Sequence, residues 1–267
     1  MDDWRSYDGI AETYERVHAP RMAEPARDLV VMAAPPAGGR VLDVGTGTGV
    51  AAQAASEAVG TQGLAVGVDV SLGMLRVGAR TRPGLRLAAA SAIDLPFRNG
   101  AFDLVTASFV VSHFTKYETA LFEMMRVLRP GGRLALSAWA DGDRDDLQKT
   151  WIELVEGVVG QGLLEDVHAQ AVPWSDRFAD REALEETLLR AGLRHVRTES
   201  REYRFVYPLA DFVEGLETWS TGRFVRSMLG TEAWESFRRR AQEVFAERFA
   251  DPVNDFRDVW LAVGTKS

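Results

Sequence analysis

Residues 41–49, with the sequence VLDVGTGTG, constrain the fold of this chain more than any other segment. The apolar residues at its start predict a short buried strand, and its three glycines predict a tight turn. The Ala-rich residues 50–59 that follow predict a helix. Because glycine is needed where the backbone takes a positive φ or passes close to a ligand, we expect this strand–turn–helix unit to face a bound molecule.

Strands and helices alternate along the chain after a break at residues 35–39, which contain Pro-Pro and Gly-Gly. Apolar runs predict strands at 40–44, 64–69, 85–90, 102–108, 133–138, 195–205 and 259–263. Helical patterns separate most of them, at 50–59, 71–80, 117–128, 147–159 and 181–191. This alternation predicts an α/β fold: a Rossmann-like, doubly wound, mostly parallel seven-stranded sheet with helices on both faces.

Two helical segments are expected to stand outside this core. Residues 4–33 predict one or two amphipathic helices, with Ile10, Tyr14 and Val17 at helical spacing. Residues 208–249 predict two or three aromatic-rich helices between the last two strands. We therefore expect three parts: an N-terminal helical lid at 1–35, a Rossmann-like core at 36–206 and 256–267, and an inserted helical cap at 207–255.

The composition argues against several classes of protein. The chain of 267 residues has a formal net charge of −8, whereas a nucleic-acid groove needs clustered Lys and Arg, so we expect no nucleic-acid partner. The N-terminus MDDWRSYDGI lacks the apolar core of a signal peptide, and no run approaches the ~18 apolar residues of a membrane span. The absence of cysteine excludes a thiolate nucleophile and fits a reducing compartment. We expect a cytoplasmic protein without membrane contact.

Two acids stand where a nucleotide-type ligand would meet them. Asp69 ends the second predicted strand, about twenty residues after the glycine turn, where a carboxylate takes the hydroxyls of a ribose. A dinucleotide site has the spacing G-x-G-x-x-G and brings a pyrophosphate to the helix N-terminus, but the spacing here is G-x-G-x-G. Asp43, inside the strand, would repel a pyrophosphate and suits the ammonium of a methionine moiety. The charge of Asp43 therefore disfavours a nicotinamide dehydrogenase.

Five stretches occur in an order that is typical of one family. They are VLDVGTGTG at 41–49, GVDVSLGML at 67–75, ASAIDLPF at 90–97, FDLVTASFVVSHF at 102–114 and LRPGGRLALS at 128–137. With them, residues 40–138 resemble the core of a class I S-adenosylmethionine-dependent methyltransferase of the ubiquinone/menaquinone-biosynthesis type. The leader YDGIAETYERV at 7–17 is similar to the start of the same family. The resemblance implies S-adenosylmethionine as the cofactor and S-adenosylhomocysteine as its product.

The resemblance also implies which residues bind this cofactor. The methionine end is expected at the first strand and its turn, on Asp43, Gly45, Thr46, Gly47, Thr48 and Gly49. Asp69 is expected on the ribose, and Val70 and Met74 on the adenine. The carbonyl of Ser108 is expected to meet the amino group of the cofactor, with Tyr14 closing over the pocket from the lid.

One part of the motif departs from the family pattern. The family usually has Gly-Asp-Ala before its Leu-Pro-Phe, whereas this chain has Ala90-Ser91-Ala92 followed by Ile93. Ser91 can still accept a hydrogen bond from the adenine amino group, beside Ala92 and Ile93, but without a charge. We expect a weaker contact there, or a substitute such as Asp94.

His113 is the first candidate for a catalytic base. It follows the fourth predicted strand, at the rim where an acceptor should enter, and the ordinary histidine pKa of about 6.5 suits proton removal. A structural role is an equal alternative, since the family often has His in this region. His18, on the N-terminal segment, is a weaker candidate for a second polar group. The residues expected at the substrate are His113, Phe109, Trp219, Phe224 and Met228.

No metal is expected at this site. A magnesium-assisted catechol-type enzyme would want acids at the end of the fourth strand, where Ser108 and Phe109 stand. The acidic loop at 141–146 lacks the glycine and the glutamate that a calcium loop requires. Methyl transfer is then an in-line displacement in which the protein aligns the reactants and excludes water.

The expected function is metal-independent transfer of a methyl group to an oxygen or nitrogen of a small organic molecule. A secondary metabolite, glycosylated or not, is favoured as the acceptor over a quinone. Two alternatives stay open: a protein of this fold that binds the cofactor but acts as a cyclase or a binding module, and a C-methyltransferase of quinone biosynthesis. A homodimer also stays open.

Overall fold

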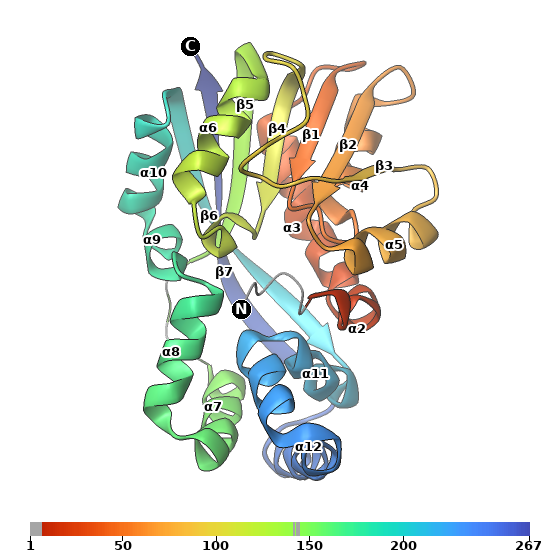
Figure 1. Cartoon of the computed structure of the whole chain (residues 1–267), viewed down its shortest axis with the longest axis vertical. Helices are drawn as coiled ribbons and strands as arrows, with labels where there is room; N and C mark the ends of the chain where they lie inside the picture. The colour runs from red at the N-terminus through yellow and green to blue at the C-terminus, as the bar shows by residue number, and fades with distance from the viewer. Residues whose placement is uncertain (1–6, 141, 143–144) are drawn as a thin grey trace.

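A seven-stranded sheet runs through the molecule with the strand order β3-β2-β1-β4-β5-β7-β6 (Figure 1). The computed structural model describes residues 7–140, 142 and 145–267. The strands are β1 (Arg40–Val44), β2 (Leu64–Asp69), β3 (Arg86–Ala89), β4 (Phe102–Ser108), β5 (Leu128–Trp139), β6 (Leu193–Tyr207) and β7 (Val253–Lys266). Neighbouring strands are parallel except β7, which is antiparallel to both β5 and β6. The predicted Rossmann-like, mostly parallel seven-stranded sheet is confirmed.

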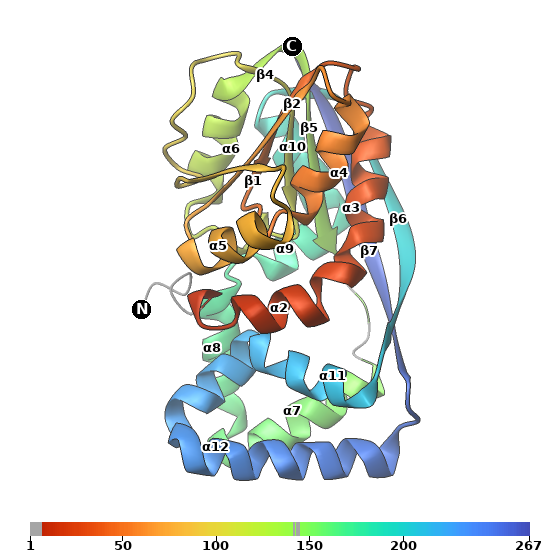
Figure 2. The same ribbon diagram turned by 90° about the vertical axis from the view of Figure 1, so that its right-hand side faces the viewer.

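Helices cover both faces of this sheet and enclose two apolar cores (Figure 2). They are α3 (Ala19–Ala33), α4 (Val50–Val59), α5 (Leu72–Thr81), α6 (Tyr117–Val127) and α10 (Arg181–Arg190). Within β1, Val41 packs in the core that contains residues of α3 and α4, while Leu42 packs in the core that contains residues of α6 and α10. Burial on both sides explains why the central strands are almost continuously apolar in the sequence.

A further group of helices lies beyond the carboxyl ends of the central strands, and we call it the cap (Figure 1). It contains α7 (Asp146–Val159), α8 (Gln161–Ala171), α11 (Leu209–Gly215), the 3-10 helix η2 (Leu216–Thr218) and α12 (Ser220–Arg248). Apart from the lid, we expected only residues 207–255 outside the core, but α7 and α8, which precede β6, pack against α12. The sequence did not predict α8, because few of its apolar side chains are buried and most of its side chains are exposed.

The helix α2 (Ala11–Val17) lies between the core and the cap (Figure 2). On the core side, Glu15 forms an ion pair with Arg82 at 2.9 Å. On the cap side, Arg16 forms an ion pair with Asp211 of α11 at 2.7 Å. Residues 1–6 of the expected lid lie outside the described residues. The described part of the lid, α2 and α3, therefore touches both other parts of the chain.

Candidate cofactor and acceptor site

The glycine turn after β1 has a conformation that glycine adopts most readily. Gly45, Gly47 and Gly49 have φ angles of 68°, 56° and 97°. The N–H of Gly45 donates to the carbonyl of Val68 on β2 at 2.8 Å, which fixes the turn to the sheet. A Cβ on Gly45 would lie 2.9 Å from Cγ1 of Val110 and closer still to its Cγ2. Residue 45 is therefore glycine for two reasons, its positive φ and the close approach of Val110.

A cavity of about 50 Å³ opens beside this turn, and we call it the glycine-turn cavity. It is lined by Tyr14, Met22, Ala26, Asp43, Gly45, Thr46, Gly47, Val50, Ala51, Ser108 and Phe109. The lid, the β1 turn with the start of α4, and the end of β4 thus all contribute to its wall. Seven residues predicted from the sequence meet here: Tyr14, Asp43, Gly45, Thr46, Gly47, Ser108 and Phe109.

Asp43 is the charged group in the wall of the cavity, and it is 1% exposed. Its carboxylate accepts a hydrogen bond from Thr46 Oγ1 at 2.6 Å and another from Thr106 Oγ1 at 2.7 Å. Burial raises the pKa of Asp43 to about 6, although both hydrogen bonds act in the opposite direction. The two hydroxyls orient the carboxylate but do not neutralise its charge. A cationic ligand would therefore offset the free-energy cost of burying this charge.

Asp69 joins the glycine turn to the start of the next helix. At the end of β2, its carboxylate accepts from the N–H of Gly47 at 2.8 Å and from the N–H of Ser71 at 2.9 Å. Burial raises the pKa of Asp69, and these backbone donors lower it in part. Since each carboxylate oxygen accepts more than one hydrogen bond, Asp69 retains capacity for a ribose hydroxyl.

The residues expected around adenine lie in two different environments. Val70 and Ile93 are exposed apolar side chains, as an adenine-binding surface without its ligand would be. Met74, by contrast, is buried and packs with Ile10 and Val77 under the lid. The hydroxyl of Ser91 accepts from the N–H of Ile93 at 3.4 Å, and Ala92 between them is half-buried. Contact of these residues with adenine stays a prediction.

The last residues of the turn serve the start of α4. Gly49 is the N-cap residue of α4, and Thr48 before it is buried. The carbonyl of Thr48 accepts from Arg82 Nη1 at 3.1 Å, and Arg82 is also the partner of Glu15 in the lid. Within the described part of the chain, the Thr48 hydroxyl has no hydrogen-bond partner. The lid is thus connected through one arginine to the turn that borders the cavity.

Phe109, directly after β4, is held in a strained backbone conformation. Its φ is 55°, which costs a bulky L-residue roughly 1–2 kcal/mol. The N–H of Phe109 donates to the carbonyl of Ser137 on β5 at 3.0 Å, which helps to hold this conformation. The Phe109 ring lies 4.4 Å from the ring of Trp139, at the end of β5. Such strain is characteristic of functional sites, and it supports the predicted role of Phe109 at the substrate.

His113 ends the 3-10 helix η1 (Val111–His113), which follows β4 as expected. Its ring lies edge-on to the ring of Tyr7, with 6.2 Å between the ring centroids. Among the described residues, the wall of the glycine-turn cavity includes Phe109 but not His113. A catalytic role for His113 therefore stays a prediction.

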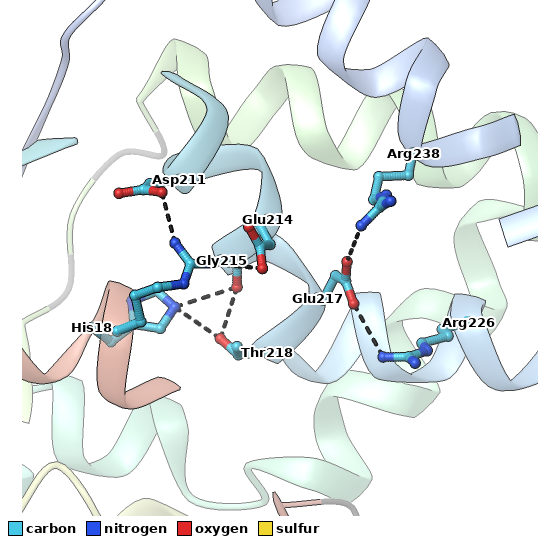
Figure 3. Close-up of polar contacts among 9 residues, drawn as sticks. His18, Asp211, Glu214, Gly215, Glu217, Thr218, Arg226 and Arg238 are labelled. Carbon is cyan, nitrogen blue, oxygen red and sulfur yellow. Dashed lines mark hydrogen bonds and ion pairs between the residues drawn. The ribbon is translucent and has the colours of Figure 1, made fainter. Parts of the chain in front are cut away.

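His18 lies where the lid meets the cap (Figure 3). Its Nε2 is 2.9 Å from Thr218 Oγ1 and 3.3 Å from the carbonyl oxygen of Gly215. Burial lowers the pKa of His18 to about 4, so the ring is neutral at pH 7. A Cβ on Gly215 would lie 3.1 Å from the His18 ring, so the contact is tight. These contacts explain His18 as a link between lid and cap, away from the wall of the glycine-turn cavity.

The three cap residues expected at the substrate differ in position. Trp219 is half-buried, with its ring 6.4 Å from that of Phe212. Phe224 packs against the core that α3 and the cap share. Met228 is an exposed side chain on α12. Of the three, Trp219 and Phe224 point into the protein, and their contact with substrate stays a prediction.

Sequence reasoning missed several residues that complete the site. Thr106 orients Asp43, and its signal was a polar residue in the middle of an apolar strand. Met22 and Ala26 line the cavity from α3, and nothing in their local sequence distinguishes them from ordinary core residues. Trp139 follows the matched stretch 128–137 and lies against Phe109 only because β4 and β5 are neighbours.

The sheet order, the glycine turn and the acids at the ends of β1 and β2 define a class I methyltransferase architecture. Residues 42–136 match the family described as a methyltransferase domain. The chain also has the fold of the YcgJ protein of Bacillus subtilis, with a TM-score of 0.59 and 20% identity over 91% of this chain and 98% of that one. The chain belongs to the class I S-adenosylmethionine-dependent methyltransferases.

Curated relatives match part or most of the chain. A demethylmenaquinone methyltransferase of Renibacterium salmoninarum is 43% identical over 104 residues, which cover 39% of this chain and 42% of the relative. A malonyl-[acyl-carrier protein] O-methyltransferase of Methylococcus capsulatus is 30% identical over 211 residues, which cover 76% of this chain and 66% of the relative. The chain spans between 40% and 45% of the length of four demethylmenaquinone methyltransferases that it matches. The family match covers residues 42–136, which include the glycine turn.

Proposed function

We propose that this protein is an enzyme that transfers a methyl group from S-adenosylmethionine to an oxygen or nitrogen of a small organic acceptor, without a metal. The observation that carries the proposal is Asp43, a buried carboxylate in the wall of a cavity at the glycine turn. A cationic amino-acid tail fits this carboxylate, whereas a pyrophosphate would meet its negative charge. A secondary metabolite, glycosylated or not, is the proposed acceptor.

Different residues of the chain bind different parts of the cofactor. Asp43 and the carbonyl of Ser108 hold the ammonium, and Asp69 holds the ribose hydroxyls. Val70 and Ile93 cover the adenine with apolar surface. The cavity of about 50 Å³ is much smaller than an ordinary ligand site, so α2 and α3, which roof it, must shift when the cofactor enters.

The chemistry requires alignment more than acid–base catalysis. When bound, the cofactor supplies an electrophilic methyl carbon attached to a sulfonium. Asp43, Ser108 and Asp69 would hold the cofactor so that its methyl group could pass to the acceptor's lone pair, with the electron pair of the carbon–sulfur bond left on sulfur. Phe109 and the lid hold the acceptor in line and keep water out. His113 accepts, as a general base, the proton that the attacking oxygen or nitrogen of the acceptor loses.

The remaining parts of the proposal concern surroundings and partners. We propose a cytoplasmic enzyme whose partner is its small-molecule acceptor, without nucleic acid, and a homodimer stays open. In the described residues, no helix combines the length and apolar character needed to cross a bilayer. The same residues contain no group of three acidic, histidine or cysteine side chains placed to hold a metal ion. The absence of acids at Ser108 and Phe109 supports a metal-independent reaction.

Two measurements in sequence test the proposed function. Calorimetry with S-adenosylhomocysteine and NAD side by side identifies the ligand class, and S-adenosylhomocysteine alone is expected to bind. Transfer of labelled methyl from S-adenosylmethionine to a panel of phenols, amines and carboxylic acids then identifies the acceptor. Binding of NAD alone would overturn the class. Cofactor binding without methyl transfer to any acceptor favours the cyclase or binding-module alternative.

The affinity for S-adenosylhomocysteine is expected to fall below pH 6. Because the pKa of Asp43 is raised to about 6, its ionised form, which the ammonium needs, is lost as the pH falls through that value. Below that pH the affinity should drop by about tenfold per pH unit. Calorimetry between pH 5 and pH 8 measures this, with Asp43→Asn as the control that flattens the profile. A constant affinity over this range would contradict the assignment of Asp43.

Replacement of His113 tests its role in proton removal. His113→Gln is expected to lower kcat by about 100-fold, in the range of general base catalysis, once an acceptor is known. The affinity for S-adenosylhomocysteine should change by less than about twofold, because His113 lies outside the cavity wall. Steady-state kinetics and calorimetry on the same samples separate the two effects. If kcat is unchanged, His113 is a structural residue.

A further inference from the structure

Trp139 presents an exposed aromatic surface next to the glycine-turn cavity. It is the last residue of β5 and is 40% exposed, although it ends a central strand of the sheet. Its ring is 4.4 Å from that of Phe109 with 32° between the two planes, and Phe109 lines the cavity. The apolar surface of the cavity wall therefore continues onto the indole of Trp139.

The ion pair between Arg257 and the buried carboxylate of Asp255 lies beside this indole. The guanidinium of Arg257 lies 5.8 Å from the ring of Trp139 and 5.9 Å from the ring of Trp219. Arg257 Nε donates to Asp255 at 2.7 Å, and Asp255 is 4% exposed. The ring of Phe205 meets Trp139 edge-on at 6.1 Å. Arg257 thus lies near one aromatic ring of the core, that of Trp139, and one of the cap, that of Trp219. We call Phe109, Trp139 and Trp219 the aromatic wall.

Two features in or beside the aromatic wall lower the stability of the folded protein. Phe109 keeps a positive φ of 55°, and Asp255 is a buried carboxylate whose partner Arg257 has a side chain that is 25% exposed. Both features act on Trp139, one by placing the Phe109 ring against it and the other by fixing the indole between strand and cap. The exposed indole is therefore positioned precisely, whereas an ordinary surface tryptophan would need no such support.

We propose that Trp139 determines acceptor specificity and that the acceptor is a planar aromatic molecule. Its ring stacks on the exposed indole, which brings an oxygen or nitrogen attached to the ring to the cavity edge at Phe109. Stacking favours a flat, conjugated ring over a saturated ring of similar size. Arg257 is a positioning residue, because it acts through Trp139. The inference rests on the proposed function, since it concerns the acceptor of that same site.

The test compares two probes of the same skeleton on the full chain loaded with S-adenosylhomocysteine. 1-Naphthol is planar and decahydro-1-naphthol is saturated, and calorimetry measures the affinity of each. The wild type should bind 1-naphthol about fivefold to tenfold more tightly than the saturated alcohol. Trp139→Ala should abolish this preference, and Trp139→Phe should keep part of it. The matched control is Phe122→Ala, which removes another exposed ring, on α6, and should leave the preference unchanged.

Binding of S-adenosylhomocysteine is measured on every variant, so that two failures are distinguishable. If the wild type does not bind S-adenosylhomocysteine, the proposed function itself fails. If it binds but shows no preference for 1-naphthol, or does not bind 1-naphthol at all, only the present inference is overturned. A preference that persists in Trp139→Ala overturns it equally. Loss of S-adenosylhomocysteine affinity in Trp139→Ala would also contradict it, because Trp139 is assigned to the acceptor.

Discussion

Asp43→Asn is expected to weaken the binding of S-adenosylhomocysteine by about 100-fold or more, because it removes the buried charge opposite the ammonium. The substitution keeps the shape of the side chain and leaves room for hydrogen bonds with Thr46 and Thr106. Calorimetry at pH 7.5 measures the loss. This is the largest effect we expect on cofactor binding from any single conservative substitution in the chain.

The stability of the same variant separates a lost charge from a lost fold. Burial raises the pKa of Asp43, so the empty protein binds a proton there more tightly than the unfolded chain does. Stability from this group is therefore present at low pH and is lost as the pH rises through about 6. The melting temperature of Asp43→Asn without ligand should accordingly equal or exceed that of the wild type at pH 7.5.

The control for Asp43→Asn is Asp103→Asn. Asp103 accepts from the N–H of Arg40 and pairs with Arg129, near the starts of β1 and β4 and away from the cavity. Its replacement should leave the affinity for S-adenosylhomocysteine within about twofold of the wild type. An Asp43→Asn protein that binds as tightly as this control would refute the electrostatic basis of the proposed site.

Gly45→Ala is expected to lower the free energy of unfolding by about 2–5 kcal/mol and to abolish cofactor binding. Two costs add: the positive φ of 68°, and the close approach of the new Cβ to Val110. Denaturant unfolding followed by circular dichroism measures the first effect, and calorimetry measures the second.

The two costs of Gly45→Ala are separable with two further variants. Gly38 also has a positive φ, 71°, but a Cβ there would meet no atom closer than 3.8 Å, so Gly38→Ala reports the backbone cost alone. Adding Val110→Ala to Gly45→Ala removes the clashing methyl groups and should recover part of the stability. If Gly45→Ala and Gly38→Ala are equally stable, Val110 does not restrict residue 45.

The core of this fold could be predicted from the sequence, because the sequence patterns that indicate its strands are local. The strands at 40–44, 64–69 and 102–108 were predicted at the bounds of β1, β2 and β4, since each is a short apolar run bordered by turn residues. The glycine turn and the place of Asp43 beside it were likewise predicted, because three glycines at this spacing indicate a tight turn next to a ligand. Recognition of the family followed from five such local stretches.

Which helices make up the cap was harder to predict from the sequence. The sequence predicted the helix α7 but placed it with the core, because a helical pattern does not say which neighbour its apolar face meets. The short helix α9 (Ser175–Ala179) and the exposed helix α8 carry too few buried apolar residues to be seen at all.

The amino-acid sequence by itself determined the alternation of strands and helices in the core, the glycine turn, and the acids beside it. Only the tertiary structure decided that His18 binds the cap, at Thr218, and that Trp139 lies against Phe109 and Arg257. The physical reason is separation along the chain. A turn is formed by neighbouring residues, whereas His18 and Thr218 are 200 residues apart and meet only after the sheet has brought lid and cap together.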